Sequence, residues 1–179
     1  MTTPLPGGDR RTGTASVTTL FVTPEGRKLR VRGVRERDLP ELHRLDQEVF
    51  GEHAYPYFVL RQFYDLYHED LFVLEDGQAF RGYVLAGTTP AQRRSWILGL
   101  AIDEGWRGHG LGRRLMAESL RRLRTQEVRE VWLTVEPAND AAIKLYASLG
   151  FTRVEYGADY FGEDADRWVM VLPLPAQRA

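Results

Sequence analysis

The chain contains no cysteine among its 179 residues. That absence excludes a disulfide scaffold, a thiolate metal site and a cysteine nucleophile. The sequence also has no apolar run approaching the roughly 18 residues of a membrane span, and its first residues lack the apolar core of a signal peptide. We therefore expect a cytoplasmic protein without a membrane partner.

A strong charge of one sign is missing as well. The chain has 24 basic and 25 acidic residues, and its formal net charge is −1. No global basic field therefore favours nucleic acid as a partner. The length suits one compact domain, which we expect over residues 27–175. Residues 1–26 are rich in Thr, Gly, Pro and Ser, so we predict a flexible tail there, although 17–22 could pair as a short strand.

Hydrophobic periodicity predicts helices interspersed among strands. Strands are expected at 28–34, 71–75, 80–86, 95–102, 130–135, 151–156 and 167–172. Helices are expected at about 39–50, in a short segment ending near 67, and at 110–126 and 139–149. The nearly all-apolar strand at 95–102 is expected to be covered on both faces. Because some strands adjoin in sequence and others flank a helix, a mixed α/β sheet is predicted rather than a purely parallel one.

The strand at 95–102 is followed by the glycine-rich turn Arg107-Gly108-His109-Gly110-Leu111-Gly112, which opens a long helix. The first amides of a helix have no intrahelical partner and carry partial positive charge, so an anion can bind there. The glycines let the backbone approach a phosphate closely, and Arg107 and Arg113 can add charge. The spacing excludes a P-loop and a Rossmann turn. Taken alone, the turn fits a glycine-rich loop that only reverses the chain better than it fits a phosphate site.

Residues 97–116, ILGLAIDEGWRGHGLGRRLM, resemble the acetyl-CoA motif of the GCN5-related N-acetyltransferases (GNAT), Arg/Gln-x-x-Gly-x-Gly/Ala. Arg107, Gly110 and Gly112 match that signature. A second segment at 133–151, LTVEPANDAAIKLYASLGF, is similar to the family's L-x-V-x-x-x-N-x-x-A-x-x-L-Y-x-x-x-G-F and lies at the expected distance. The resemblance implies the GNAT fold: an α/β protein with a mixed, mostly antiparallel sheet of six to seven strands and about four helices. Its central parallel pair of strands would splay around acetyl-CoA, with no metal.

The resemblance also implies which residues hold the coenzyme. Its pyrophosphate would lie on the turn from Arg107 to Gly112, and its pantetheine arm would bond to the backbone of Leu100, Ala101 and Ile102. Asn139 would either hydrogen-bond the pantetheine or cap its helix. Tyr146 lies seven residues later, about two helical turns, so both project from one face.

Amine attack on the thioester needs a neutral amine, a stabilised oxyanion and a proton for the departing thiolate. A tyrosine with a pKa of about 10 stays protonated at neutral pH and can donate to a thiolate whose conjugate acid has a pKa of about 8.5. We therefore predict that Tyr146 is the general acid. A backbone amide among residues 100–102 would polarise the carbonyl.

Within the family, the chain is most similar to the protein N-terminal acetyltransferases, the RimI-like and catalytic NatA groups. Residues 50–58, FGEHAYPYF, resemble their first substrate loop, and residues 160–170 resemble their ending Y-Y-x-x-G-E-D-A-x-x-M with two extra residues. By position, Glu52, Tyr55 and Tyr160 would contact the substrate.

One departure concerns the base. Thr134 stands where those enzymes carry a carboxylate or histidine, so the role of base falls to Glu52, His53 or a water chain. At pH 7 about one-tenth of an α-amine with a pKa of about 8 is neutral, whereas the neutral fraction of a lysine with a pKa of about 10.4 is only about 4 in ten thousand, or about 250-fold smaller. A site without a strong base therefore favours α-amines or small amines with a lowered pKa.

Three functions remain open at this point. The first is acetylation of a protein or peptide N-terminus, and the second is acetylation of a small amine such as an antibiotic, a polyamine or a metabolite. The third is a non-catalytic acetyl-CoA-binding domain, which the presence of Asn139 together with Tyr146 disfavours. A homodimer is compatible with the sequence.

Overall fold

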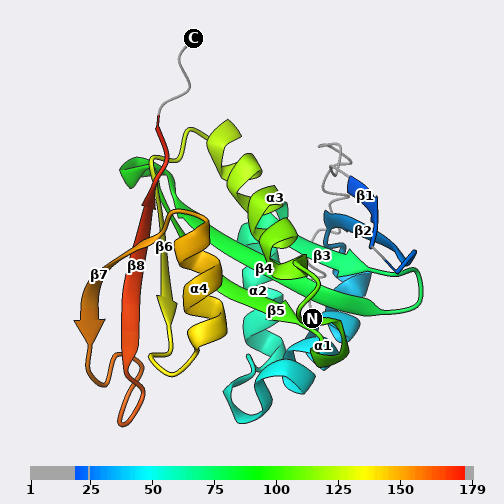
Figure 1. Cartoon of the computed structure of the whole chain (residues 1–179), viewed down its shortest axis with the longest axis horizontal. Coiled ribbons are helices and arrows are strands. Elements are labelled where there is room, and N and C mark those ends of the chain that lie inside the picture. Colours follow the sequence, from blue (N-terminus) through cyan, green and yellow to red (C-terminus); the bar gives the residue numbers. More distant parts are fainter. Residues whose placement is uncertain (1–18, 24, 176–179) are drawn as a thin grey trace, which may run out of the picture.

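The structure, a computed structural model, describes residues 19–23 and 25–175. In these residues eight strands form one sheet in the order β1-β2-β3-β4-β5-β6-β8-β7 (Figure 1). The strands are β1 (Thr19–Val22), β2 (Lys28–Gly33), β3 (Leu71–Glu75), β4 (Phe80–Thr89), β5 (Arg94–Ile102), β6 (Glu130–Val135), β7 (Thr152–Gly157) and β8 (Arg167–Pro173). The α-helices are α1 (Leu39–Phe50), α2 (Tyr57–Tyr67), α3 (Leu111–Thr125) and α4 (Asp140–Ser148).

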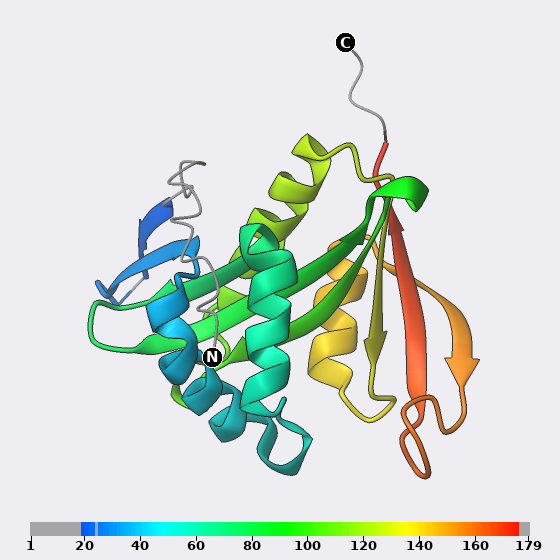
Figure 2. The ribbon, with the colours of Figure 1, turned by 180° about the vertical axis from the view of Figure 1, so that it is seen from behind.

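The helices cover the two faces of the sheet in pairs. α3 and α4 lie on the face that Figure 1 shows in front, and α1 and α2 lie on the opposite face, which Figure 2 shows. β5 and β6 pair in parallel, and every other pair of neighbouring strands in the described sheet is antiparallel. No helix in the described ranges combines the length and the hydropathy that crossing a bilayer requires.

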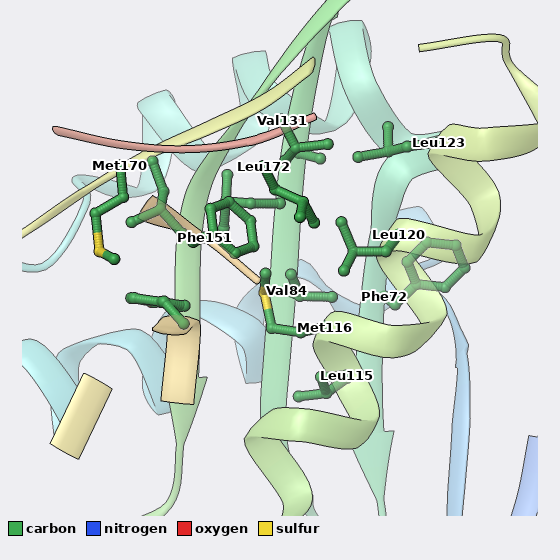
Figure 3. Close-up of a cluster of buried hydrophobic side chains, with 14 of the residues drawn as sticks. Phe72, Val84, Leu115, Met116, Leu120, Leu123, Val131, Phe151, Met170 and Leu172 are labelled. Atoms are coloured by element: carbon green, nitrogen blue, oxygen red, sulfur yellow. The ribbon is translucent and has the colours of Figure 1, made fainter. Parts of the chain in front are cut away.

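The larger core lies between the sheet and the α3–α4 layer (Figure 3). The inward face of α3 repeats at spacings of three and four, as the sequence predicts, and its apolar residues there are all buried: Leu111, Leu115, Met116, Leu120 and Leu123. They meet strand residues such as Val84, Val131 and Leu172. Truncating one such leucine to alanine typically costs about 2–5 kcal/mol, so this packing fixes the position of α3 on the sheet.

The sheet has one strand more than the six to seven predicted. Residues 19–22, assigned from the sequence to a tail, form β1 and pair with β2 from Thr19↔Val31 to Val22↔Lys28. The physical reason is an alternation that the short segment hides: Phe21 packs against the core while its two neighbours are exposed. The boundary predicted at residue 27 therefore lies inside the sheet, and residues 1–18 and 24 of the expected tail lie outside the described residues.

Candidate active site

The parallel strands β5 and β6 separate about half-way along β5. Their pairing runs from Arg94↔Glu130 to Ile97↔Leu133 and ends there, although β5 continues to Ile102. In Figure 1 the two ribbons diverge toward the lower edge of the view. From Leu98 onward, the β6-facing edge of β5 has no partner strand in the described sheet. Leu98 O and Ile102 O accept side-chain hydrogen bonds from Tyr55 and Arg107, and the other backbone groups on this edge are available to an extended ligand.

The side chains of β5 reflect the same parting. Residues 98–100 are half-buried, so the expectation that 95–102 is covered on both faces is wrong for this stretch. On the β4 side the register shifts at Leu85/Ala86, which pair with Gly99 and Ile97 and leave Leu98 as the extra residue of a bulge. A bulge bends and twists its strand. The bulge thus lies where β5 turns away from β6.

The turn after β5 presents open backbone amides. Gly108 and Gly110 adopt positive φ angles of 81° and 71°, with open space where a Cβ would lie. α3 has no side-chain cap, and its first intrahelical bond runs from Arg114 N to Gly110 O at 3.2 Å. The amides of residues 111–113 consequently lack intrahelical partners, and no acidic residue lies in the first turn. This is the electrostatic environment that an anion requires.

Side chains of the turn stabilise it through hydrogen bonds to neighbouring residues. Arg107 Nε donates to Ile102 O at 3.2 Å, and His109 Nδ1 lies 2.8 Å from Arg107 O. Arg113 on α3 donates to the Ser148 hydroxyl on α4. His109 is thus bonded to its own loop, while its ring remains accessible.

Gly112 has a different role from the two glycines before it. A Cβ built on Gly112 would lie 3.2 Å from Leu145 Cδ2 and 3.8 Å from Ile102 Cγ1. From the sequence, we interpreted this glycine as one that lets the backbone approach a phosphate. Its surroundings show that it lets the start of α3 pack closely against α4 and β5.

α4 carries the two residues of the second motif. Asn139 Oδ1 accepts the Ala142 N–H at 3.1 Å, so this side chain caps the helix. Tyr146 is buried, its ring lies 5.9 Å from that of Phe151, and burial raises the pKa of its hydroxyl to about 12. No hydrogen bond joins the Tyr146 hydroxyl to another described residue, and burial is the one cause of its raised pKa. Among the described residues it is a protonated donor without an acceptor.

The loop between α1 and α2 is tied to β5 through one side chain. Tyr55 donates its hydroxyl to Leu98 O at 2.8 Å and packs edge-on against Phe63. Burial raises the pKa of Tyr55, and the nearby Asp46 adds to that effect. Glu52 and His53, in contrast, are exposed in the short 3₁₀ turn Gly51–His53.

The loop between β7 and β8 is folded by its own acidic side chains. Asp166 accepts the Tyr156 hydroxyl and the Asp159 N–H, and Asp159 accepts the Asp164 N–H at 2.9 Å. Tyr160 is 40% exposed and lies edge-on against Phe161. This loop and the α1–α2 loop both lie at the lower edge of the molecule in Figures 1 and 2. No hydrogen bond joins Tyr160 to Glu52 or Tyr55 in the described ranges.

The chain is similar to known proteins of one family. The sequence profile of the acetyltransferase (GNAT) family matches residues 37–151. The chain belongs to this family. N-alpha-acetyltransferase 30 of Schizosaccharomyces pombe is 32% identical over 143 residues, which are 75% of this chain and 90% of that protein. The N-alpha-acetyltransferase of Sulfurisphaera tokodaii is 26% identical over 162 residues, 84% of this chain and 96% of that protein.

A solved structure agrees on the architecture of this GNAT acetyltransferase. Naa50 of Arabidopsis thaliana, in complex with the bisubstrate analogue CoA-Ac-MVNAL, superposes with a TM-score of 0.72 at 23% identity, covering 82% of this chain and 99% of that one. The predicted GNAT fold and the predicted acetyl-CoA-dependent N-acetyltransferase activity are thereby confirmed.

Three residues of the acetyltransferase escaped the sequence analysis: Asp46, Tyr83 and Gly99. Asp46 on α1 accepts the Tyr55 N–H at 2.7 Å and also the Tyr83 hydroxyl. The one available signal was its position: Asp46 follows Leu42 by four residues and precedes Val49 by three, on the apolar stripe of α1. An acid on that stripe needs an internal partner.

Proposed function

We propose that this protein transfers the acetyl group of acetyl-CoA to the α-amino group of a protein or peptide N-terminus. The observation that carries the proposal is the bond from the Tyr55 hydroxyl to Leu98 O. That bond holds an aromatic loop beside the residue at which β5 leaves β6. The relatives support the same acceptor class, because two are named N-alpha-acetyltransferases and the Naa50 analogue joins CoA to the peptide MVNAL.

On this proposal the coenzyme is held mainly by backbone. The uncapped amides of the turn from Arg107 to Gly112 hold the pyrophosphate, with Arg107 and Arg113 adding charge. The unpaired edge of β5 at residues 100–102 bonds the pantetheine arm in the manner of an added strand. Asn139 uses its oxygen for the helix cap, which leaves its amide nitrogen to donate to the arm.

Tyr146 is the proposed general acid. Its pKa of about 12 lies about 3.5 units above that of a thiol near 8.5, so complete proton transfer is uphill by about 5 kcal/mol. A reaction with about ten turnovers per second has a barrier of about 16 kcal/mol. The transfer therefore fits below the barrier, and Tyr146 remains protonated at every physiological pH.

The acceptor side consists of Glu52 and Tyr55 on one loop and Tyr160 on the other. Glu52 is exposed and is the proposed base, acting directly or through water. Its task is modest, because about one-tenth of an α-amine with a pKa near 8 is already neutral at pH 7. A lysine side chain would require a far stronger base.

A coenzyme-A release assay tests the proposed acceptor. The panel holds peptides with free α-amines and no lysine, the same peptides with a blocked N-terminus and one lysine, a polyamine and an aminoglycoside. We expect kcat/KM for the free α-amines to exceed that for the blocked peptides by about 250-fold, as the pKa difference of about 2.4 units requires. Mass spectrometry should place the acetyl group on the α-nitrogen. Turnover of small amines alone would exclude the proposed acceptor, and acetyl-CoA binding without any turnover would exclude an enzyme.

A further inference from the structure

A buried carboxyl group on α1 lies directly behind the acceptor loop. Asp46 is 0% exposed, and no lysine or arginine in the described residues forms an ion pair with it. Burial raises the pKa of Asp46, although hydrogen bonds from Tyr83 and the Tyr55 amide oppose the shift. An acid at such a position is destabilising unless its oxygens are bonded.

Both oxygens of Asp46 are bonded, and to two different parts of the site. Oδ2 accepts the backbone N–H of Tyr55 at 2.7 Å, and Oδ1 accepts the hydroxyl of Tyr83 from β4. Tyr55 in turn donates its own hydroxyl to Leu98 O at 2.8 Å. One carboxyl group therefore fixes both the backbone of the acceptor loop and a side chain under the sheet.

Tyr83 also contacts β5, at Gly99, the residue that follows Leu98. Tyr83 is fully buried, and a Cβ on Gly99 would lie only 2.9 Å from its hydroxyl oxygen. Glycine at 99 is therefore what allows the Tyr83 hydroxyl to reach Asp46 beneath the strand. Leu98 and Gly99 are the first two residues of β5 beyond its last pair with β6.

We propose that Asp46 is a positioning residue that sets the affinity for the acceptor by fixing the Tyr55 loop to β5 where the strand parts from β6. It touches neither coenzyme nor acceptor and acts through Tyr55 and Tyr83. The proposal rests on the proposed function only for the claim that the Tyr55 loop contacts the acceptor. It also predicts that Asp46 is not the base, since both oxygens are occupied by donors of the protein itself.

Two substitutions separate positioning from proton transfer. In Asp46→Asn, the amide oxygen can accept the Tyr55 N–H while the amide nitrogen donates to the Tyr83 oxygen. The contacts are kept and basicity is lost, although the Tyr83 hydroxyl proton gives up its acceptor. Asp46→Leu removes both acceptors and leaves two buried donors unsatisfied. Each unsatisfied donor lowers the equilibrium constant for the conformation that buries it by about 5- to 150-fold. We expect Asp46→Leu to raise the acceptor KM at least about tenfold, and Asp46→Asn to stay within about threefold of wild type. The KM for acetyl-CoA should change less than about twofold in both.

Hydrogen exchange gives a readout that does not depend on activity. The Tyr55 amide should exchange at least about tenfold faster in Asp46→Leu and near the wild-type rate in Asp46→Asn. Tyr83→Phe, which removes one donor and keeps the ring, should raise the acceptor KM about threefold if Asp46→Leu fails to fold. Asp70→Asn is the control, because Asp70 is a second buried aspartate with a burial-raised pKa, and its partners are Gln126 and Arg122 instead of the acceptor loop.

The outcomes are distinct. Loss of kcat in Asp46→Asn as large as in Asp46→Leu would overturn positioning in favour of a base. An unchanged acceptor KM in Asp46→Leu and Tyr83→Phe, or an equal change in Asp70→Asn, would reduce Asp46 to a structural residue. If wild-type enzyme acetylates only small amines, the proposed function fails, and the same variants assayed with that amine still decide the role of Asp46.

Discussion

The two sides of the proposed site, one for the coenzyme and one for the acceptor, are built by different means. On the coenzyme side, the turn from Arg107 to Gly112 and the open edge of β5 offer backbone groups, arranged by glycines and by the start of one helix. On the acceptor side, two loops are held in shape by side chains: Asp46 under one, Asp159 and Asp166 within the other. A backbone site requires particular residues in consecutive positions, whereas a side-chain site can recruit them from anywhere. The first therefore leaves a motif in the sequence and the second does not.

The largest effect on activity is expected from Tyr146, which we place between the two sides, near the thioester sulfur of acetyl-CoA. Tyr146→Phe removes the proposed acid while the buried ring keeps its contact with Phe151. We expect kcat to fall by about 10²- to 10⁴-fold, the usual contribution of a general acid, with the KM for acetyl-CoA within about twofold. Steady-state kinetics of coenzyme-A release measure both constants. Tyr67→Phe on α2 is the control, and undiminished turnover in Tyr146→Phe would assign the proton to another donor.

A pair of glycines tests the coenzyme side alone. Gly110 and Gly77 both have positive φ angles, 71° and 88°, with open space around a built Cβ. Alanine at either position should cost about 1–2 kcal/mol of folding free energy from the left-handed backbone. Only Gly110→Ala moves amides of the turn, so we expect about tenfold weaker coenzyme-A binding in that variant, about 1.4 kcal/mol.

Calorimetric titration with coenzyme A and thermal melts of the two variants separate these effects. The acceptor KM should stay at the wild-type value in Gly110→Ala. Equal weakening of coenzyme-A binding in Gly77→Ala would show that lost stability, and not the turn, is responsible.

The acceptor side alone is tested at Tyr160, whose ring is exposed on the β7–β8 loop. Tyr160→Ala should raise the peptide KM about fivefold, which corresponds to about 1 kcal/mol of aromatic contact, and leave coenzyme-A affinity unchanged. Tyr160→Phe should keep most of the affinity if the ring makes the contact. Steady-state titration of the peptide distinguishes the two, and an unchanged KM in Tyr160→Ala would remove this residue from the acceptor site.

The same division explains what could be predicted from the sequence. The stripe of α3 and the turn before it follow from local spacing, and both lie where expected. The parting of β5 from β6 was expected only from the family resemblance. Its position does not follow from local spacing, because the residues of β5 stay apolar up to Ile102 and only the partner strand shows where pairing stops. A strand at β1 was considered, but a tail was preferred, because a four-residue strand with one inward aromatic carries almost no periodic signal.

The loops illustrate the limit most clearly. Asp159 and Asp164 adopt φ angles of 50° and 60°, and the first of them bonds the backbone of the second. From the sequence, the acidic run there is compatible with a cationic substrate, but it fits a solvated hairpin at least as well. Turn-forming hydrogen bonds depend on backbone conformations that no local sequence pattern records. Asp46 was visible as an acid on an apolar stripe, but its partners come from β4 and from a loop nine residues away.

The smallest effect is a predicted absence in the pH profile. Activity should rise as the acceptor amine loses its proton, through a pKa of about 8. An essential acid causes a falling limb as the pH passes its pKa, and burial places that of Tyr146 at about 12. We therefore expect kcat/KM to stay level between about pH 8.5 and 10, with the same rising limb in Tyr146→Phe at lower amplitude. A falling limb near pH 9 that disappears in Tyr146→Phe would mean that bound coenzyme lowers the pKa of this hydroxyl. A falling limb that persists in that variant would show that another group is the acid. Tyr146 would then no longer connect the backbone-built coenzyme side with the side-chain-built acceptor side at the thioester sulfur.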